Sequence, residues 1–374
     1  TVMVGFSGEI VEEWIKGEFS EINVLWQKEQ LGTGHAARLA RDWWKDYENV
    51  VILPGDTPLI KADTLRKFIN AHIENDNSCS FLSFDLPDPA GYGRVIRDGL
   101  SVRIVEHKDA TPDERKCREV NSGMYVFKTS ALSSVIDGLN CVNSQKEYYL
   151  PDAVALIEQD GGRTDAVKAS DATEFLGIND PNQLAAAASV MKKRILDKWM
   201  DSGVRCNDPA STWIGPKVEL GEDVEIWPSV QLWGRTSIGS GCTVGSFTVI
   251  SDSVLEDCVE IVGSVRIKKS RVGERSTVGP FVFIRDGAEL HSDVHVGRFV
   301  EIKKSTVRSG AKVPHLSYVG DADIGEKTNI GAGTITCNYD GEKKNFTKIG
   351  NNCFVGSDTM FVAPVTIGDD VVTA

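Results

Sequence analysis

The stretch VGERSTVGPFVFIRDGAELHSDVHVGRFVE (272–301) decides the fold of the second half of this chain. It places an aliphatic residue at every sixth position, often followed by glycine. A fixed period of six is typical of a coil in which each hexapeptide forms one flat side of a triangle. The aliphatic residue points inward and stacks on its equivalents in the neighbouring coils.

The same spacing extends in both directions from this stretch. Repeats run from IGPKVE (214–219) to VGSFTV (244–249), and again from IGNNCF (349–354) to IGDDVV (367–372). So many repeats in phase predict a parallel β-helix rather than a β-sandwich or a chance pattern.

Two stretches interrupt the repeat: VRSGAKVPHLSYVGD (307–321) and NYDGEKKNFTK (338–348). We expect both to leave the coil as loops, because a β-helix does not need them for stability and long loops often carry function. The alternative is that they are tolerated surface insertions.

Candidate chemical groups lie in and near the first interruption. An imidazole side chain suits a general base near neutral pH, which makes His315 a candidate, and Tyr318 lies close to it in sequence. Arg285 and Lys303 place cations on the repeat face, as a phosphorylated sugar would require. The alternatives are a structural histidine and ordinary solvated surface charge.

The first half of the chain has a different pattern, in which short apolar runs alternate with helix-like segments. VVILPGD (50–56) and SCSFLSFDL (78–86) indicate strands, the first of them buried. DTLRKFINAHIE (63–74) has helical spacing, with Asp63 as its expected cap. This alternation predicts an α/β domain, Rossmann-like, with a mostly parallel sheet.

A helix-forming segment, NQLAAAASVMKKRILDKWMDSG (182–203), separates the two patterns and ends in glycine. We therefore predict three parts: a nucleotide-handling domain over residues 1–180, a linker helix over 181–203 and the β-helix over 204–374.

Composition excludes several classes of protein. The net charge of −13 argues against nucleic-acid binding, and no apolar run approaches the length of a membrane span. The 8 cysteines form no CxxC or cysteine–histidine pattern, so we expect reduced thiols and a cytoplasmic protein.

Two short features of the first half could handle a nucleotide. QKEQLGTGHAA (27–37) is a glycine-containing turn before a helix, which alone is a weak signal. Asp56 follows a strand, where a carboxylate can hold Mg²⁺ against phosphate oxygens. A solvated turn aspartate is the equal alternative.

Longer stretches of the second half go beyond the fold to one family. VGPFVFIRDGAEL, VGRFVEIKKS, HLSYVGDADIG and NIGAGTITCNYDG resemble the acetyltransferase half of the bacterial bifunctional N-acetylglucosamine-1-phosphate uridyltransferase/glucosamine-1-phosphate N-acetyltransferases. The resemblance implies a left-handed β-helix, a homotrimer, and direct acetyl transfer from acetyl-CoA to the 2-amino group of glucosamine 1-phosphate.

The resemblance also assigns roles to residues. It implies that His315 is the base, and that the sugar phosphate is held by Arg285, Lys303, Tyr318 and Asn329. It further implies that the acetyl-CoA site is lined by Ala332, Asn338, Tyr339 and Ser357.

The first half resembles the uridylyltransferase half of the same family through GYGRVI (91–96), IVEHKDA (104–110), EVNSGMY (119–125), EYYLPDAV (147–154) and GINDPNQL (177–184). That half joins UTP to N-acetylglucosamine 1-phosphate and releases pyrophosphate. The resemblance implies uracil contacts from Gln27, Gly32 and Thr33, and sugar and ribose contacts from Gly93, Glu106 and Asn121. It implies that Asp56 and Asn179 hold Mg²⁺.

The sequence departs from the family in four places. It starts at TVMVGFSGEI (1–10) without a stretch like the family's LAAGxGTRM phosphate loop, and it stops in mid-repeat, so we expect an internal fragment. Pro54 stands where tyrosine is common, and Phe283 where arginine is common.

Two other functions stay open at this point. One is a sugar-nucleotide pyrophosphorylase whose β-helix is only structural or regulatory, against which the HLSYVGD and NIGAGTITCNYDG motifs argue. The other is a non-enzymatic scaffold, which gains weight only because the phosphate loop is missing.

Overall fold

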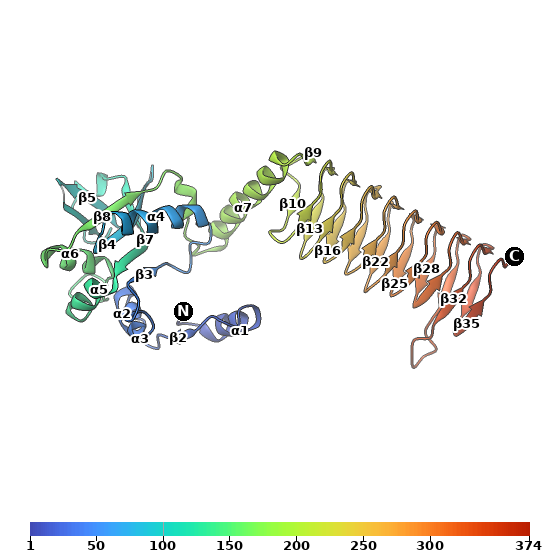
Figure 1. Cartoon of the computed structure of the whole chain (residues 1–374), viewed down its shortest axis with the longest axis horizontal. Helices are drawn as coiled ribbons and strands as arrows, with labels where there is room; N and C mark the ends of the chain where they lie inside the picture. Colours follow the sequence, from blue (N-terminus) through green and yellow to red (C-terminus); the bar gives the residue numbers. More distant parts are fainter. Residues whose placement is uncertain (100) are drawn as a thin grey trace. The chain divides into compact units, whose positions relative to one another are not determined.

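The computed structural model describes residues 1–99 and 101–374, which form two compact units, Thr1–Ala187 and Ala188–Ala374 (Figure 1). We call them unit 1 and unit 2. The division falls inside helix α7 (Pro181–Asp201), which the sequence predicted as the linker helix. Gly203, just past α7, has a φ of 97°, a left-handed conformation that favours glycine and ends the helix.

Unit 1 is an α/β domain, as predicted, built around a six-stranded sheet in the described residues. The order is β6-β5-β7-β4-β8, with β3 paired to β7. Its strands are β3 (Asn49–Ile52), β4 (Cys79–Asp85), β5 (Arg94–Asp98), β6 (Ser101–Val105), β7 (Glu119–Lys128) and β8 (Thr164–Lys168). The α-helices are α2 (Thr33–Leu39), α3 (Arg41–Trp44), α4 (Ala62–Glu74), α5 (Thr129–Val135) and α6 (Pro151–Gln159).

Short 3₁₀ turns and a separate small sheet complete unit 1. The turns are η1 (Glu114–Lys116), η2 (Ile136–Gly138) and η3 (Ala172–Phe175). Strands β1 (Val2–Val4) and β2 (Val24–Trp26) pair with each other, and helix α1 (Gly8–Glu18) connects them.

Strand β4 shows why the sheet is covered on both faces. Phe81 packs in a core cluster with α6 residues, whereas its neighbour Leu82 packs in a second cluster with Phe68 of α4. Because successive side chains of a strand point to opposite faces, an apolar run such as SCSFLSFDL requires cover on both sides.

Three details of unit 1 differ from the sequence predictions. The sheet is mixed, not mostly parallel: β4–β8 is parallel, while β7 is antiparallel to β3, β4 and β5. Strand β3 pairs with β7 alone among the described strands, so it is a partly exposed edge strand and not a buried one. Asp63 lies inside the first turn of α4, where it pairs with Arg66, and Lys61 is the N-cap residue.

Unit 2 forms three parallel sheets of nine strands each in its described residues, an arrangement typical of the predicted left-handed β-helix. The first sheet contains β10 (Trp213–Ile214), β13 (Gln231–Trp233), β16 (Val249–Ser251), β19 (Arg266–Lys268), β22 (Phe283–Arg285), β25 (Glu301–Lys303), β28 (Tyr318–Gly320), β31 (Ile335–Cys337) and β34 (Met360–Val362). We call it the β10–β34 sheet.

The second sheet, β11–β35, contains β11 (Glu219–Leu220), β14 (Ser237–Ile238), β17 (Val254–Leu255), β20 (Arg271–Val272), β23 (Glu289–Leu290), β26 (Thr306–Val307), β29 (Ala322–Ile324), β32 (Thr347–Ile349) and β35 (Val365–Ile367). The third, β9–β33, contains β9 (Arg205–Cys206), β12 (Glu225–Ile226), β15 (Thr243–Val244), β18 (Glu260–Ile261), β21 (Thr277–Val278), β24 (His295–Arg298), β27 (Lys312–His315), β30 (Asn329–Ile330) and β33 (Phe354–Val355).

The aliphatic anchors form the core of unit 2, as the spacing predicted. Val278, Ile284 and Leu290 are each at most 1% exposed and belong to one continuous cluster. In each coil the chain therefore turns three corners and returns with its anchor stacked on the previous one (Figure 1).

The predicted loop over residues 307–321 is wrong. These residues form β27 and β28 and lead into β29, each paired with the coil before it. Val313 and Val319 continue the spacing of six from Val307 and are buried, while His315 occupies an outward position. His315 and Pro314 interrupt the sequence pattern, but the buried residues Val313 and Val319 still follow the six-residue repeat.

The second predicted loop is confirmed. After β31 the chain leaves the coil at Asn338 and protrudes before β32 begins at Thr347 (Figure 1). Thr347 still pairs with Ala322, so the excursion does not disturb the register of the coil. No helix among the described residues is long and apolar enough to cross a membrane.

The stacked column of anchors provides a test of what holds unit 2 together. Ile302 is fully buried and pairs with Ile284 and Val319 in the adjacent coils. We expect Ile302→Ala to lower the free energy of unfolding of unit 2 by about 2–5 kcal/mol, because the column cannot collapse around the cavity. Urea denaturation measures this loss, and Glu260→Ala at an exposed position of β18 is the control. Equal midpoints for the two variants would contradict the argument.

Candidate functional site

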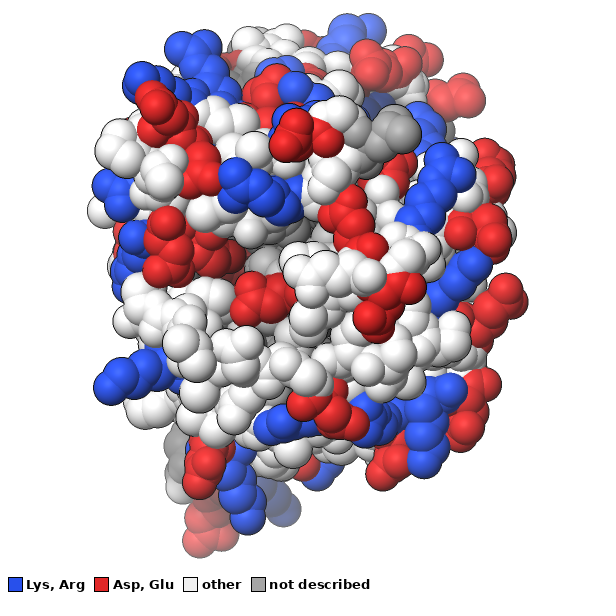
Figure 2. Space-filling model, turned by 90° about the vertical axis from the view of Figure 1, so that its left-hand side faces the viewer, with Lys and Arg blue, Asp and Glu red and all other residues white. Residues whose placement is uncertain are grey.

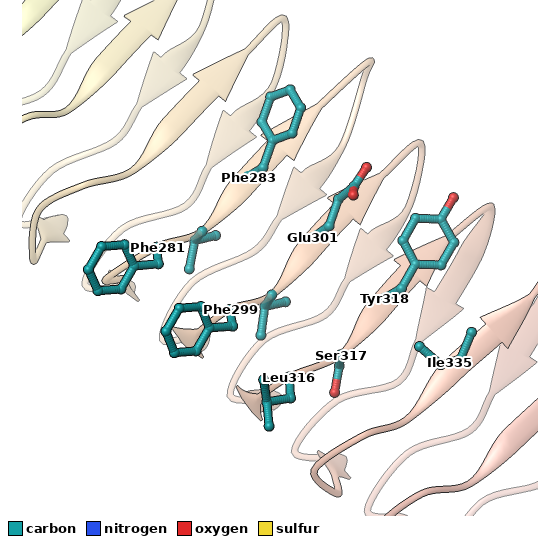
Figure 3. A pocket seen from close by; sticks show the side chains of 10 residues that line it. Phe281, Phe283, Phe299, Glu301, Leu316, Ser317, Tyr318 and Ile335 are labelled. Atoms are coloured by element: carbon teal, nitrogen blue, oxygen red, sulfur yellow. The ribbon is translucent and has the colours of Figure 1, made fainter.

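Three of the predicted sugar-phosphate residues lie together on the outer face of the β10–β34 sheet. Arg285 at the end of β22 pairs in register with Lys303 at the end of β25. Tyr318 follows in the next coil, in register with Glu301 (Figure 3). Adjacent strands lie about 4.8 Å apart, so these side chains form a continuous polar surface across three coils.

Gly320 gives Tyr318 its position. Gly320 follows Lys303 in register, and a Cβ added to it would lie 2.4 Å from Tyr318 Oη. The phenol therefore occupies the space that any other residue would fill. Asn338 Nδ2 lies 3.4 Å from Tyr318 Oη and donates to Asp321 Oδ2 at 2.5 Å, which orients the amide.

Arg285 is held by carboxylates on both sides. Its Nε donates to Glu301 Oε1 at 2.8 Å, and its Nη1 donates to Asp286 Oδ2 at 2.5 Å. The hydrogen bond to Glu301 is the main cause that raises the pKa of Arg285 above its usual value. The guanidinium is thus fixed in place and stays charged, which suits a phosphate-binding group.

His315 and Asn329 lie on a different face, the β9–β33 sheet. His315 pairs in register with Arg298, and Asn329 pairs with Lys312. The chain turns the corner at Leu316, with a φ of 45°, before it reaches Tyr318. Within one chain, therefore, His315 does not share a face with Arg285, Lys303 and Tyr318.

The predicted acetyl-CoA residues lie in the coils that follow. The Ala332 carbonyl accepts from the Asp358 backbone N–H at 2.7 Å, which brings Ala332 beside the turn that contains Ser357. Asn338 begins the protruding loop, and its neighbour Tyr339 is 56% exposed. Lys344 lies 4.5 Å from the centre of the Tyr339 ring.

In unit 1, the three predicted uracil contacts lie together at the start of α2. Gln27 Nε2 donates to the Gly32 carbonyl at 3.1 Å, and Thr33 Oγ1 accepts from the Leu150 backbone N–H at 3.1 Å. Gly32 has a φ of 97°, and a Cβ there would lie 2.7 Å from the Tyr148 carbonyl oxygen. Glycine is required at this turn both for conformation and for close approach.

The predicted sugar contacts also come together: Gly93 directly precedes β5, Glu106 directly follows β6, and Asn121 lies on β7. Glu106 Oε1 lies 3.2 Å from the Cβ that Gly93 lacks, and the Asn121 backbone N–H donates to the Gly93 carbonyl at 2.9 Å. Burial, followed by the charges of Asp109 and Asp152, raises the pKa of Glu106 above its usual value. This half-buried carboxylate is available to accept hydrogen bonds from sugar hydroxyls.

Asp56 and Asn179 converge on Gly177. A Cβ at Gly177 would lie 3.6 Å from Asp56 Oδ2 and 3.7 Å from Asn179 Nδ2. No cluster of three His, Cys, Asp or Glu residues among the described residues could hold a metal by itself. One carboxylate and one amide nevertheless fit Mg²⁺, which keeps several waters and takes its remaining oxygens from substrate phosphates.

Charges of both signs cover the face drawn in Figure 2, where Lys and Arg side chains are interspersed with Asp and Glu side chains. Neither positive nor negative charge predominates on that face. Phosphate groups must therefore be met by individual residues at a site.

Sequence reasoning missed two residues beside the sugar contacts. Tyr149 is 8% exposed, and burial is the main cause that raises the pKa of its hydroxyl above its usual value. Asp152 lies in the first turn of α6. Burial, and to a smaller extent the charge of Asp109, raises the pKa of Asp152 above its usual value. Both residues lie in the EYYLPDAV segment, but only the packing of α6 against β6 brings them near enough for the charge of Glu106 to interact with them.

Comparisons with known proteins match this architecture. The Nucleotidyl transferase family matches residues 2–204, and the bacterial transferase hexapeptide family matches residues 217–252. Bifunctional protein GlmU of Carboxydothermus hydrogenoformans is 46% identical over 372 residues, covering 99% of this chain and 82% of the relative. The GlmU proteins of Heliobacterium modesticaldum and Fervidobacterium nodosum are 45% and 44% identical, covering 98% and 100% of this chain and 80% of each relative.

This chain belongs to the GlmU family. It is a bifunctional enzyme with a uridyltransferase activity and an acetyltransferase activity. The identification confirms the predicted family. It excludes the two alternatives, a sugar-nucleotide pyrophosphorylase with a purely structural or regulatory β-helix and a non-enzymatic scaffold. The GlmU relatives align with both units of this chain in one continuous match.

Gly320 offers a test of the site in unit 2. We expect Gly320→Ala to reduce acetyl transfer at least tenfold, because the new methyl displaces the Tyr318 hydroxyl from the cation surface. Assays of thiol release from acetyl-CoA measure the loss. Gly368→Ala is the matched control, since a Cβ there has nothing within 4 Å. Unchanged activity in the Gly320 variant would show that the phenol position is unimportant.

Asp152 offers a test in unit 1 with a defined pH dependence. Its raised pKa means that the folded state disfavours the ionised carboxylate, so its contribution to stability falls as the pH rises through that pKa. We expect Asp152→Asn to raise the Tm of unit 1 at pH 7 by on the order of 2 °C. The gain should vanish below the ordinary aspartate pKa of 3.8.

Scanning calorimetry between pH 3.5 and 8 follows this gain. Asp160→Asn, at an exposed carboxyl group, is the control and should show no comparable trend. A gain of equal size at every pH would contradict the assignment of the effect to the Asp152 charge.

Proposed function

We propose that unit 2 transfers the acetyl group of acetyl-CoA to the 2-amino group of glucosamine 1-phosphate. Unit 1 then joins the product, N-acetylglucosamine 1-phosphate, to UTP and releases pyrophosphate. The observation that carries the proposal is the surface formed by Arg285, Lys303 and Tyr318 in a chain of the GlmU family.

In the acetyl transfer, Arg285 and Lys303 neutralise the sugar phosphate and Tyr318 donates a hydrogen bond to it. His315 accepts a proton from the amino group as the nitrogen attacks the thioester carbonyl. The new C–N bond forms, the C–S bond breaks, and coenzyme A leaves as the thiol. Because the amine attacks directly, the reaction needs no cysteine nucleophile, and half-buried Cys337 at the end of β31 has no role in it.

His315 lies around a corner from the cations, so we propose that the site is completed by another copy in a homotrimer. Exposed apolar side chains on the corner support self-assembly: Phe281 and Phe299 are each 55% exposed and stack 5.2 Å apart, and Leu316 continues the row (Figure 3). We call this row the apolar ridge. It borders a hollow of about 480 Å³ that Tyr318 also lines. Contiguous exposed apolar side chains are typical of a protein–protein contact.

In unit 1, Gln27, Gly32 and Thr33 would hold the uracil, while Gly93, Glu106 and Asn121 would orient the sugar and ribose. Asp56 and Asn179 would hold Mg²⁺, which when bound offsets phosphate charge. Positioning of the two substrates by these residues supplies the rest of the catalysis.

Replacement of His315 tests the acetyltransferase. We expect His315→Ala to lower kcat by about 10²–10⁴, the range for loss of a general base. Thiol release from acetyl-CoA, with and without glucosamine 1-phosphate, measures it. His291→Ala, at another exposed histidine of unit 2, is the control. The variant should retain Mg²⁺-dependent pyrophosphate release by unit 1, because His315 lies in unit 2.

Sedimentation of the same preparations tests the assembly, and three chains per particle are expected. An active monomer would contradict the shared site. Full acetyl transfer by the His315 variant would contradict its role as base.

A further inference from the structure

The coil that precedes Arg285 carries another cation in the same row. Lys268, at the end of β19, pairs in register with Arg285, and Arg285 pairs with Lys303. The sequence repeats one motif on either side of Arg285: IKKS at 267–270 and again at 302–305. The three side chains therefore project from three successive coils on one face of the β10–β34 sheet.

The two lysines are the free charges of this row. Arg285 is paired with Glu301 and Asp286. Among the residues that the structure describes, the ammonium groups of Lys268 and Lys303 form no ion pair, and Lys268 is exposed. Unneutralised positive charge thus flanks Arg285 on both sides, in a chain whose net charge is −13.

Arg266, on the same strand as Lys268, adds to the local charge. Its guanidinium lies 5.8 Å from the centre of the Phe283 ring, and Arg285 lies 5.5 Å from the same ring. Phe283 stands where the family commonly has an arginine. In this chain the aromatic ring lies within 6 Å of two guanidinium groups, and β19 supplies two cations, Arg266 and Lys268, next to Arg285 of β22.

We propose that Lys268 is a third cation for the phosphate monoester of the amino sugar, an inference that rests on the proposed acetyl transfer. Lys268 and Lys303 are two strand spacings apart, roughly 10 Å between Cα atoms. Their flexible four-carbon stems let both ammonium groups converge over Arg285. A doubly charged phosphate above Arg285 can then be contacted from both sides.

The order of the coils gives the direction of the sugar. The predicted acetyl-CoA residues Ala332, Asn338 and Ser357 belong to coils after Tyr318, while the cations belong to coils before it. The amino group therefore points toward β31 and the phosphate toward β19. Lys268 faces the phosphate and lies away from the reacting nitrogen, so its loss weakens binding and leaves the chemical step intact.

Binding and kinetics of the full chain test the inference. Titration calorimetry with glucosamine 1-phosphate should give a Kd about fivefold higher for Lys268→Ala, the size expected for one exposed ion pair. KM for the same substrate should rise in parallel, with kcat and the KM for acetyl-CoA unchanged. Lys268→Arg should restore both values, and the defect should shrink at high ionic strength.

Lys269→Ala is the matched control, because it removes the same charge from the adjacent residue, which lies at the corner with a φ of 48°. Equal Kd values for Lys268→Ala and the unaltered chain would overturn the inference, as would equal defects in the two alanine variants. If the unaltered chain binds glucosamine 1-phosphate but transfers no acetyl group, the proposed reaction fails and the Kd comparison still decides the role of Lys268. If it does not bind this ligand, both proposals fail.

Discussion

Inward stacking of one aliphatic side chain on the next is the interaction on which unit 2 depends. Val278 lies over Val296, and Ile284 lies over Ile302, each with almost no exposed surface. Because the inward positions are in register, the outward positions are in register as well. The row from Lys268 to Lys303 is therefore a consequence of how the core packs. A binding surface for an anion needs no dedicated loop in such a fold, only suitable residues next to the anchors.

The sequence predicted most where one physical rule acts alone. The spacing of anchors was sufficient for the β-helix, because few folds besides a parallel β-helix bury an aliphatic residue at every sixth position. The prediction failed over residues 307–321 because His315 and Pro314 interrupt the apparent pattern, while Val313 and Val319 keep the repeat. The repeat is encoded by the buried residues only.

In unit 1 the prediction was weaker because pairing depends on contacts distant in sequence. An apolar run such as VVILPGD is compatible with a central or an edge strand, and only the pairing of β3 with β7 alone decides between them. Similarly, residue types indicated Glu106 and Asn121, but the burial that raises the pKa of Glu106 comes from packing.

The loop that begins at Asn338 has a consequence for how this fold can change over evolution. The chain leaves the coil after β31 and re-enters at β32, where Thr347 pairs with Ala322. The added residues therefore do not change the register of the strands. An insertion within a strand would instead shift every later outward side chain to the wrong position. Variation in length is thus confined to the corners of the triangle, while the flat sides stay constant. A change in the length of this loop therefore leaves the outward row of Arg285 and Lys303 in the earlier coils unaltered.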